Sequence, residues 1–230
     1  MIDLTHLPKH VGIIMDGNRR WAKLHKLAVL QGHDFVAEKV IEPLVDRCIE
    51  LKVGYLTFWA FSTENWKRDE MEVNGLMNIF RSAFQKNCQL LHDKGIKIQA
   101  IGNIACFPSD IQKEVERWQD ISKNNTKITV IFALNYGGRD EVMRAIHSID
   151  PEKVATIQEA EFSQLLDTGG VPDIDFIIRT GGEQRMSGFM PWQAVYSELY
   201  FTKILMPDFS PTELDIALED FAKRRRNFGK

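Results

Sequence analysis

The sequence contains no apolar run that approaches the roughly 20 residues needed to cross a bilayer, and no charged-then-apolar leader opens it. It has only three cysteines, Cys48, Cys88 and Cys106, which are too few and too widely spaced for a disulfide framework or a zinc motif. We expect all three to be small core residues in a reducing compartment. The chain is therefore expected to be soluble and cytoplasmic.

Two common ligand-binding signatures are also absent. The sequence has neither a Gly-x-x-x-x-Gly-Lys-Ser/Thr loop nor a Gly-x-Gly-x-x-Gly turn, so the usual nucleotide-binding motifs give no support. A formal net charge of −3 provides no global basic field. We therefore expect no nucleic-acid partner.

What the sequence does contain is a regular alternation of apolar strands and amphipathic helices. With 230 residues, 44% of them hydrophobic, the chain can bury a large core, and we expect one domain over residues 1–230. The alternation predicts an α/β fold with a mostly parallel sheet of about six strands surrounded by helices. Predicted strands cover 11–15, 55–61, 96–101, 127–134, 174–179 and 199–201. Predicted helices cover 32–51, with a possible kink at Pro43, and 70–94, 109–121, 139–148, 158–167 and a segment from 211.

The first strand ends abruptly in Asp16-Gly17-Asn18, followed by Arg19 and Arg20. Open α/β sheets place their ligand crevices at the carboxyl ends of strands. Glycine lets backbone N–H groups approach a phosphate, arginine supplies forked donors, and aspartate is a hard ligand for Mg²⁺. This stretch therefore indicates an anion site with a metal, although a tight turn that caps the next helix accounts equally well for the tripeptide alone.

Other strands also end in polar residues. Because parallel strands share a carboxyl edge, these side chains are expected to meet in one crevice that suits a diphosphate. The expected set is Asp16, Asn65, Arg68, Arg139 and Arg179. For Arg139 we favour a structural role in the turn at 136–138.

Five ordered blocks make the pattern specific: HVGIIMDGNRRWA at 10–22, Gly32-His33, FSTENWKR at 61–68, NYGGRDE at 135–141, and IRTGGEQRMSGFMPWQAVYSELYFT at 178–202. PDF at 207–209 and RRRNFG at 224–229 follow. This order resembles that of the cis-prenyltransferases, the undecaprenyl diphosphate synthase family. The Asp-Asp-x-x-Asp motif, with which helical trans-prenyltransferases hold magnesium, is absent.

The resemblance implies Mg²⁺-dependent condensation of isopentenyl diphosphate with an allylic diphosphate. It implies that Asp16 is an essential carboxylate near the diphosphates and Mg²⁺, that Glu198 is a second metal ligand, and that Asn65 assists proton removal. Implied contacts of the allylic diphosphate are Gly17, Asn18, Arg20, His33 and Arg68, and those of isopentenyl diphosphate are Arg179, Arg185 and Ser187. Further implied substrate-binding residues are Arg19, Trp21, Ser62, Thr63, Glu64, Trp66 and Met186. His33 could alternatively be a helix-start residue, and Glu183 is left outside the metal set.

The resemblance also implies a homodimer, at most peripheral membrane contact, and an apolar cavity for the growing chain. Candidate cavity walls are Leu76, Phe80, Phe84, Ile131 and Phe132, although apolar residues at helical spacing are more often core. Two other functions remain open. One is a short-chain or branched-coupling synthase of the same fold, and the other is a non-catalytic partner subunit.

The chain departs from the family pattern at a few positions. Val29 stands where the family commonly has an arginine that contacts the allylic diphosphate, and we hypothesise that Arg19 or Lys26 supplies the missing charge. Further departures are Gly188, Pro191 and Asn227. Asn227 replaces an arginine that in the family contributes across the subunit interface.

Overall fold

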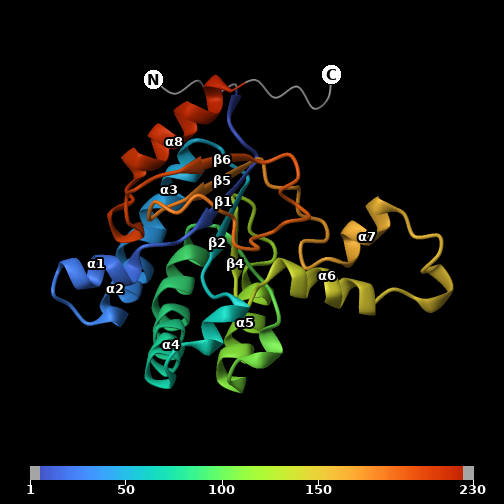
Figure 1. Ribbon diagram of the computed structural model, residues 1–230, viewed down its shortest axis with the longest axis horizontal. Helices are drawn as coiled ribbons and strands as arrows, with labels where there is room; N and C mark the ends of the chain where they lie inside the picture. The colour runs from blue at the N-terminus through green and yellow to red at the C-terminus, as the bar shows by residue number, and fades with distance from the viewer. Residues whose placement is uncertain (1–5, 225–230) are drawn as a thin grey trace.

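The computed structural model describes residues 6–224 and contains one six-stranded sheet (Figure 1). All of its neighbouring strands run parallel, in the order β3-β4-β2-β1-β5-β6. The strands are β1 (His10–Ile14), β2 (Tyr55–Trp59), β3 (Lys97–Ile101), β4 (Thr129–Ala133), β5 (Phe176–Arg179) and β6 (Glu198–Phe201). The predicted α/β class, strand number and direction are confirmed.

The register sets where the carboxyl edge lies. Ile14, the last residue of β1, pairs with Trp59 of β2 on one side and Arg179 of β5 on the other. β1 and β2 are buried at the centre of the sheet, as expected for near-continuous apolar runs. The segments that follow these strands therefore begin close together.

The two faces of the sheet are covered differently. The larger apolar core packs one face against α3 (Ile41–Glu50), α4 (Glu70–Asp93), α5 (Ser109–Ser122) and α8 (Pro211–Lys223). On the opposite face, Ile14, Ile131 and Ile177 pack against Phe189 and Met190 from the segment after β5. The remaining helices are α1 (Asn18–Leu24), α2 (Val29–Phe35), α6 (Gly138–His147) and α7 (Glu159–Leu165). Shorter turns are η3 (Thr63–Lys67), η4 (Ile104–Cys106), η5 (Pro151–Lys153) and η6 (Met206–Asp208).

The helix predicted over 32–51 begins earlier, at Val29, and contains the π-helical turn η2 (Val36–Val40) between α2 and α3. Pro43 follows this turn. A proline inside a regular helix lacks an N–H and its ring clashes with the carbonyl four residues before it, which here is that of Lys39. A wider turn that includes Lys39 relieves this conflict, so the expected disturbance at Pro43 takes the form of a π turn.

The cysteine prediction is correct for two of the three residues. Cys48 and Cys88 are buried, and burial raises the pKa of each thiol to about 12. Cys106 is exposed because it ends the surface turn η4 rather than facing the core, so its predicted core placement is wrong. Among residues 6–224, no helix is both long and apolar enough to cross a bilayer.

Candidate active site

The chain changes direction sharply after β1 and leaves Asp16 at the carboxyl edge of the sheet. Gly17 has φ 106°, a left-handed conformation that favours glycine, and a Cβ there would lie only 2.8 Å from Leu205 Cδ2. α1 then begins at Asn18. The Asp-Gly-Asn tripeptide therefore does form a tight turn, and this turn places a carboxylate beside the end of β5.

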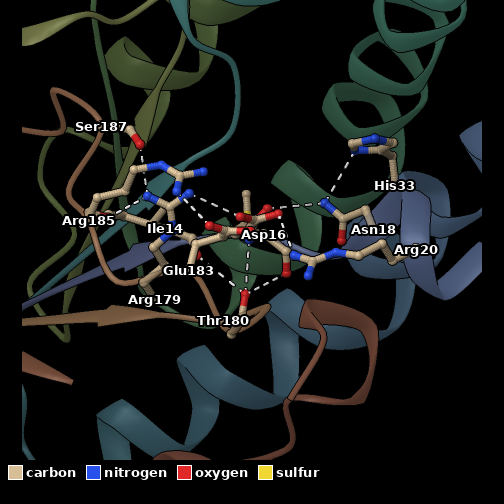
Figure 2. Close-up of polar contacts among 11 residues, drawn as sticks. Ile14, Asp16, Asn18, Arg20, His33, Arg179, Thr180, Glu183, Arg185 and Ser187 are labelled. Atoms are coloured by element: carbon tan, nitrogen blue, oxygen red, sulfur yellow. Dashed lines mark hydrogen bonds and ion pairs between the residues drawn. The ribbon is translucent and has the colours of Figure 1, made fainter. Parts of the chain in front are cut away.

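The Asp16 carboxylate lies between two guanidinium groups (Figure 2). Arg20 Nη2 donates to Oδ1 at 3.2 Å, and Arg179 Nη2 donates to Oδ2 at 3.0 Å. The Thr180 hydroxyl donates to the Asp16 carbonyl at 2.7 Å and accepts from the Asp16 amide at 2.9 Å. Residues at the end of β5 thus fix both the backbone and the side chain of Asp16.

Arg179 connects Asp16 to the loop after β5. Its side chain is only 6% exposed, and its Nη1 donates to Ser187 Oγ at 2.8 Å and to the Arg185 carbonyl. Its buried Nε has no hydrogen-bond partner among residues 6–224. A buried guanidinium N–H without a protein partner is a donor available to an anion.

Asn18 determines the tautomer of His33. Asn18 Nδ2 donates to the Met15 carbonyl at 3.2 Å and to His33 Nδ1 at 3.3 Å, so the ring proton of neutral His33 is assigned to Nε2. Burial, followed by the positive charges of Arg68 and Arg19, lowers the pKa of His33 from 6.5 to about 4. His33 Nε2 has no partner within the described residues, so the neutral ring offers one free N–H donor.

A second cationic group forms where α4 begins. Arg68 Nη1 donates to Glu72 Oε1 at 2.9 Å, and Arg19 Nη2 lies 3.6 Å from Glu72 Oε2. Glu72 is 13% exposed and holds both guanidinium groups near each other. Lys26, by contrast, lies in the exposed turn between α1 and α2.

The turn after β2 supplies the amide of Asn65. The Ser62 backbone N–H donates to Asn65 Oδ1 at 3.0 Å, which fixes the plane of this amide. Ser62, Glu64 and Asn65 all line one cavity.

A cavity of about 490 Å³ opens between this polar edge and α4. At one end it is lined by polar and charged groups and along the rest by apolar side chains. The polar lining at that end consists of Asp16, Asn18, His33, Ser62, Glu64, Asn65, Arg68, Arg179 and Ser187, and Asn87 is a further polar residue among the apolar walls. The apolar lining includes Val36, Ala37, Ile41, Leu76, Ile79, Phe80, Ala83, Phe84, Leu91 and Phe132. Such a cavity accommodates an anionic head with an apolar tail.

A family model described as putative undecaprenyl diphosphate synthase matches residues 14–229. The chain belongs to this family of prenyltransferases. It is 42% identical to an isoprenyl transferase of Neisseria gonorrhoeae, over 100% of this chain and 92% of the relative. It is 41% identical to an isoprenyl transferase of Treponema denticola, over 96% of this chain and 97% of the relative.

Solved structures agree with the family assignment. Lavandulyl diphosphate synthase from Lavandula x intermedia, crystallised with dimethylallyl diphosphate, is 33% identical with a TM-score of 0.91, covering 98% of this chain and 100% of that one. A probable undecaprenyl diphosphate synthase from Campylobacter jejuni is 27% identical with a TM-score of 0.82, covering 97% and 99%. The predicted family and enzyme class of this prenyltransferase are therefore confirmed.

The prenyltransferase brings most of the predicted crevice residues together. Asp16, Asn65, Arg68 and Arg179 all line the cavity, but Arg139 does not. Of the predicted walls, Leu76, Phe80, Phe84 and Phe132 line it. Ile131 does not, because alternate strand residues point to opposite faces and its side chain lies in the core across the sheet.

Glu198 is not near Asp16 within one chain of the prenyltransferase. It begins β6 and pairs with Phe176, whereas the carboxyl edge lies three residues further along, about 10 Å of strand, where Phe201 pairs with Arg179. Its carboxylate accepts from Arg224 Nη1 at 2.8 Å. The predicted pairing of the two carboxylates in one metal site is therefore not formed within a single chain.

Two predicted tryptophans lie outside the cavity lining. Trp21 donates to Asp208 Oδ1 at 2.7 Å, and Trp66 donates to Asn135 Oδ1 at 2.8 Å while packing against Phe61. Both rings thus support the turns that carry the site from outside the cavity lining, and their contact with substrate stays a prediction.

The other predicted residues lie around the cavity rather than in its wall. Arg185 pairs with Glu183 at 2.5 Å, consistent with leaving Glu183 outside the metal set. A Cβ on Gly137 would meet Thr63 Oγ1 at 2.7 Å, so Thr63 faces that glycine. Met186 packs in the core on the far face of the sheet.

Within the described residues, the polar end of the cavity suits a Mg²⁺ ion that is held jointly by protein and substrate phosphates rather than by protein side chains alone. Among residues 6–224, no group of three or more His, Cys, Asp or Glu side chains is placed to hold a metal. Mg²⁺ is, however, often held by one or two carboxylates together with substrate phosphates and water. The Asp16 carboxylate, 31% exposed at the cavity, suits that role, and the buried Asn18 Oδ1, which has no partner within the described chain, is another hard oxygen close by.

Sequence reasoning missed the wall formed by the helix over 29–50. Ala37 and Ile41 are four residues apart, a spacing that places two side chains on one helical face, but the same pattern also describes core. It also missed Glu72. The Arg68-to-Glu72 spacing is a helical ion-pair signal that could have identified this carboxylate.

Proposed function

We propose that this prenyltransferase is a Mg²⁺-dependent cis-prenyltransferase that condenses isopentenyl diphosphate with an allylic prenyl diphosphate to make a polyprenyl diphosphate. The observation that carries the proposal is one cavity whose polar end holds Asp16, His33, Arg68 and Arg179 and whose remainder is apolar. That gradient suits a diphosphate head joined to a prenyl tail.

Two anion sites would serve the two substrates. On one side, Arg20, Arg68 and the His33 Nε2–H would bind the allylic diphosphate. On the other, Arg179 and Ser187, which are already joined at 2.8 Å, would bind isopentenyl diphosphate, with Arg185 from the same loop. The Arg179 Nε, which has no partner within the described part of the chain, is a donor for that second diphosphate.

The chemistry requires fixed positive charge at the allylic diphosphate. The bond between the allylic carbon and the diphosphate oxygen breaks while the isopentenyl double bond attacks that carbon, so negative charge develops on the leaving diphosphate. Guanidinium groups held in place beforehand stabilise this charge where it develops. His33 remains neutral because its pKa is lowered to about 4, so its Nε2–H donates a hydrogen bond to the diphosphate while the ring takes up no further proton.

Mg²⁺, when bound near Asp16, would neutralise diphosphate charge and help the leaving group depart. Arg20 and Arg179 already hold both oxygens of Asp16, so the carboxylate is aligned before any ligand binds. The resulting carbocation loses one proton to form the new double bond, and inorganic diphosphate is released. We propose that the Asn65 amide, fixed by the Ser62 N–H, takes part in this proton removal together with the departing diphosphate.

A second candidate activity is a single short-chain or branched coupling with the same active-site groups. The TM-score of 0.91 to a lavandulyl diphosphate synthase favours keeping this alternative. Product length and branching separate the two candidates.

The decisive experiment incubates the purified protein with labelled isopentenyl diphosphate, Mg²⁺ and, separately, dimethylallyl, geranyl, farnesyl and geranylgeranyl diphosphates. A ladder of products that disappears with Asp16→Ala and with a chelator supports the proposed function. Asp110→Ala, which removes an exposed carboxylate paired with Arg81, is the matched control and should leave the ladder unchanged. A single short product favours the second candidate, and no product with any primer contradicts both.

We also propose a homodimer. Exposed apolar side chains on α6, Met143 and Ile146, and on the segment before β6, Val195, provide surface for a second copy. The predicted contribution of the closing residues, including Asn227, lies outside the described residues. Sedimentation analysis of the purified protein tests the assembly state.

For location, we propose a cytoplasmic enzyme with peripheral membrane contact. The support is the α1–α2 corner, which we define as residues 19–33 and which lies at the left edge of Figure 1. It contains Arg19, Arg20, Lys23 and Lys26 but no acidic residue, in a chain of net charge −3. Leu24 is 72% exposed within it. Basic and apolar side chains together are typical of surfaces that bind anionic lipid.

A further inference from the structure

The cavity lies between two helices that run side by side, α4 and the helix over 29–50 (Figure 1). They touch near the polar end, where a Cβ on Gly75 would lie 2.2 Å from Leu30 Cδ1. They are joined again at the far end, where Lys94 Nζ contacts Glu42 at 2.6 Å and Asp46 at 2.7 Å. The distance between these helices therefore sets the width of the cavity.

Between these two contacts, two polar contacts join α4 to η2, and one of them, the ion pair of Lys86 with Glu38 at 3.4 Å, lies outside the cavity lining. Asn87 Nδ2 of α4 donates to the Ala37 carbonyl of η2 at 2.7 Å, and both residues line the cavity. Every other α4 side chain in the lining is a hydrocarbon or the Cys88 thiol. From residue 75 to residue 87 the helix rises about 18 Å, so this bond lies well beyond the diphosphate end.

The Asn87 bond reaches the opposite wall at the π turn. Carbonyls of a regular α-helix accept from N–H groups of the same helix, whereas a π turn widens the helix and disturbs this ladder. Ala37 lies inside η2, the turn that precedes Pro43. Burying a side-chain amide in an apolar wall without a hydrogen-bond partner costs free energy. The hydrogen bond from Asn87 to the Ala37 carbonyl is therefore favoured over its loss.

We propose that Asn87 is a specificity-determining residue that limits product length by tying α4 to the π turn across the cavity. A prenyl chain that grows past this point must pass the amide and spread the two walls. The inference rests on the proposed function, because it assigns a length limit to the product of that reaction. In this proposal the hydrogen bond of Asn87, and not only the volume of its side chain, limits the length of the product.

Two variants separate the bond from the volume. Asn87→Leu keeps a similar volume but cannot donate, and Asn87→Ala removes both the donor and the volume. Asn78→Leu is the matched control, because Asn78 is exposed on the same helix and outside the cavity lining. The readout is the product-length distribution with farnesyl and isopentenyl diphosphates, measured alongside the rate of the first condensation.

We expect both Asn87 variants to lengthen the products by one isoprene unit or more, with the first condensation unchanged, and the control to match the wild type. A longer product from Asn87→Ala alone would show a volume effect and overturn the proposal, as would unchanged length in both. If the wild type makes no product, the proposed function fails instead.

Binding then provides a separate test of the bond. Calorimetry with non-reactive thiolo analogues of geranyl, farnesyl and geranylgeranyl diphosphate needs no turnover. The affinity for these analogues should increase more steeply with prenyl chain length in Asn87→Leu than in the wild type. The same increase in both proteins would overturn the proposal.

Discussion

Asp16 and Arg179 come from neighbouring strands and meet because those strands end together. Residue types at strand ends were enough to predict this pair, and also Asn65 and Arg68, since parallel strands share one carboxyl edge. Glu198 could not be placed in the same way. Its position depends on where β6 begins, and its carboxylate lies three residues before the edge, paired with Arg224.

Val29 provides no positive charge for the allylic diphosphate, and the structure favours Arg19 over Lys26 as the residue that supplies it. Arg19 lies 3.6 Å from Glu72, which also holds Arg68 of the cavity wall. Arg19→Ala should weaken binding of the allylic diphosphate by roughly 10- to 100-fold, because a charge-assisted contact contributes about 1.5–3 kcal/mol.

Steady-state kinetics with varied allylic substrate provide the measurement. The comparison is Lys26→Ala, which should leave the Michaelis constant for that substrate unchanged. If both substitutions raise the Michaelis constant equally, the charge comes from the α1–α2 corner as a whole. If neither substitution changes it, the hypothesis is wrong.

At the scale of elements, the contact between α2 and the start of α1 determines where His33 lies. α2 approaches so closely that a Cβ on Gly32 would be 2.2 Å from the Asn18 carbonyl oxygen. Gly32→Ala must push the helix away, which separates His33 from Asn18 and costs about 1–3 kcal/mol of folding free energy. We expect a lower thermal midpoint and weaker binding of the allylic diphosphate.

Gly54→Ala provides the matched control for this substitution. Among residues 6–224, the only atom within 4 Å of a Cβ at Gly54 is the Lys9 carbonyl oxygen at 3.5 Å, an ordinary contact. Thermal unfolding and substrate binding should both stay close to the wild type. A Gly32→Ala protein with wild-type binding would show that the helices do not need this close approach.

The pattern of strands and helices was predictable from sequence, whereas the details of the helix over 29–50 were not. Its apolar positions follow helical spacing, but they fit burial in the core and a cavity wall equally well. The start at Val29 and the π turn depend on packing against α4 and on Pro43. Likewise, the helical spacing after residue 186 is too weak to predict that this segment covers one face of the sheet.

At the scale of the whole molecule, a buried histidine at the amino edge of the sheet should make folding sensitive to acid. His10 is fully buried, with Nδ1 donating to the Pro172 carbonyl at 2.8 Å and Nε2 accepting from the Thr57 hydroxyl at 2.7 Å. Burial lowers the pKa of His10 to about 4, although the Pro172 carbonyl and Asp175 act in the opposite direction.

The unfolded chain takes up this proton near pH 6.5, and the folded chain only near pH 4. The unfolded state therefore binds more protons between these values, and the free energy of unfolding falls as the pH falls, by up to about 1.4 kcal/mol per pH unit from this group. Urea titrations at pH 7, 6 and 5 measure the slope. His10→Gln should reduce it, exposed His147→Gln should not, and an unchanged slope in His10→Gln would contradict the assignment.

The α1–α2 corner allows a test of how the whole molecule meets a bilayer. Leu24 and Leu27 are 72% and 40% exposed, and Lys23 and Lys26 lie beside them, so insertion of leucine and attraction of lysine to anionic lipid act together. Each lysine contributes about 1 kcal/mol at an anionic surface, which predicts binding that weakens as salt rises. We expect co-sedimentation with vesicles that contain phosphatidylglycerol, and little with phosphatidylcholine alone.

The Leu24→Ser and Lys23→Gln variants should each lose several-fold in vesicle affinity while keeping activity in detergent, because neither side chain lines the cavity. Val154→Ser is the matched control, since Val154, the residue directly after η5, is 61% exposed and lies outside the corner. If the control loses as much affinity as Leu24→Ser, binding is not specific to the corner. If Leu24→Ser instead shifts the sedimentation of the lipid-free protein from dimer to monomer, the corner binds a second copy of the chain and the lipid assignment is wrong.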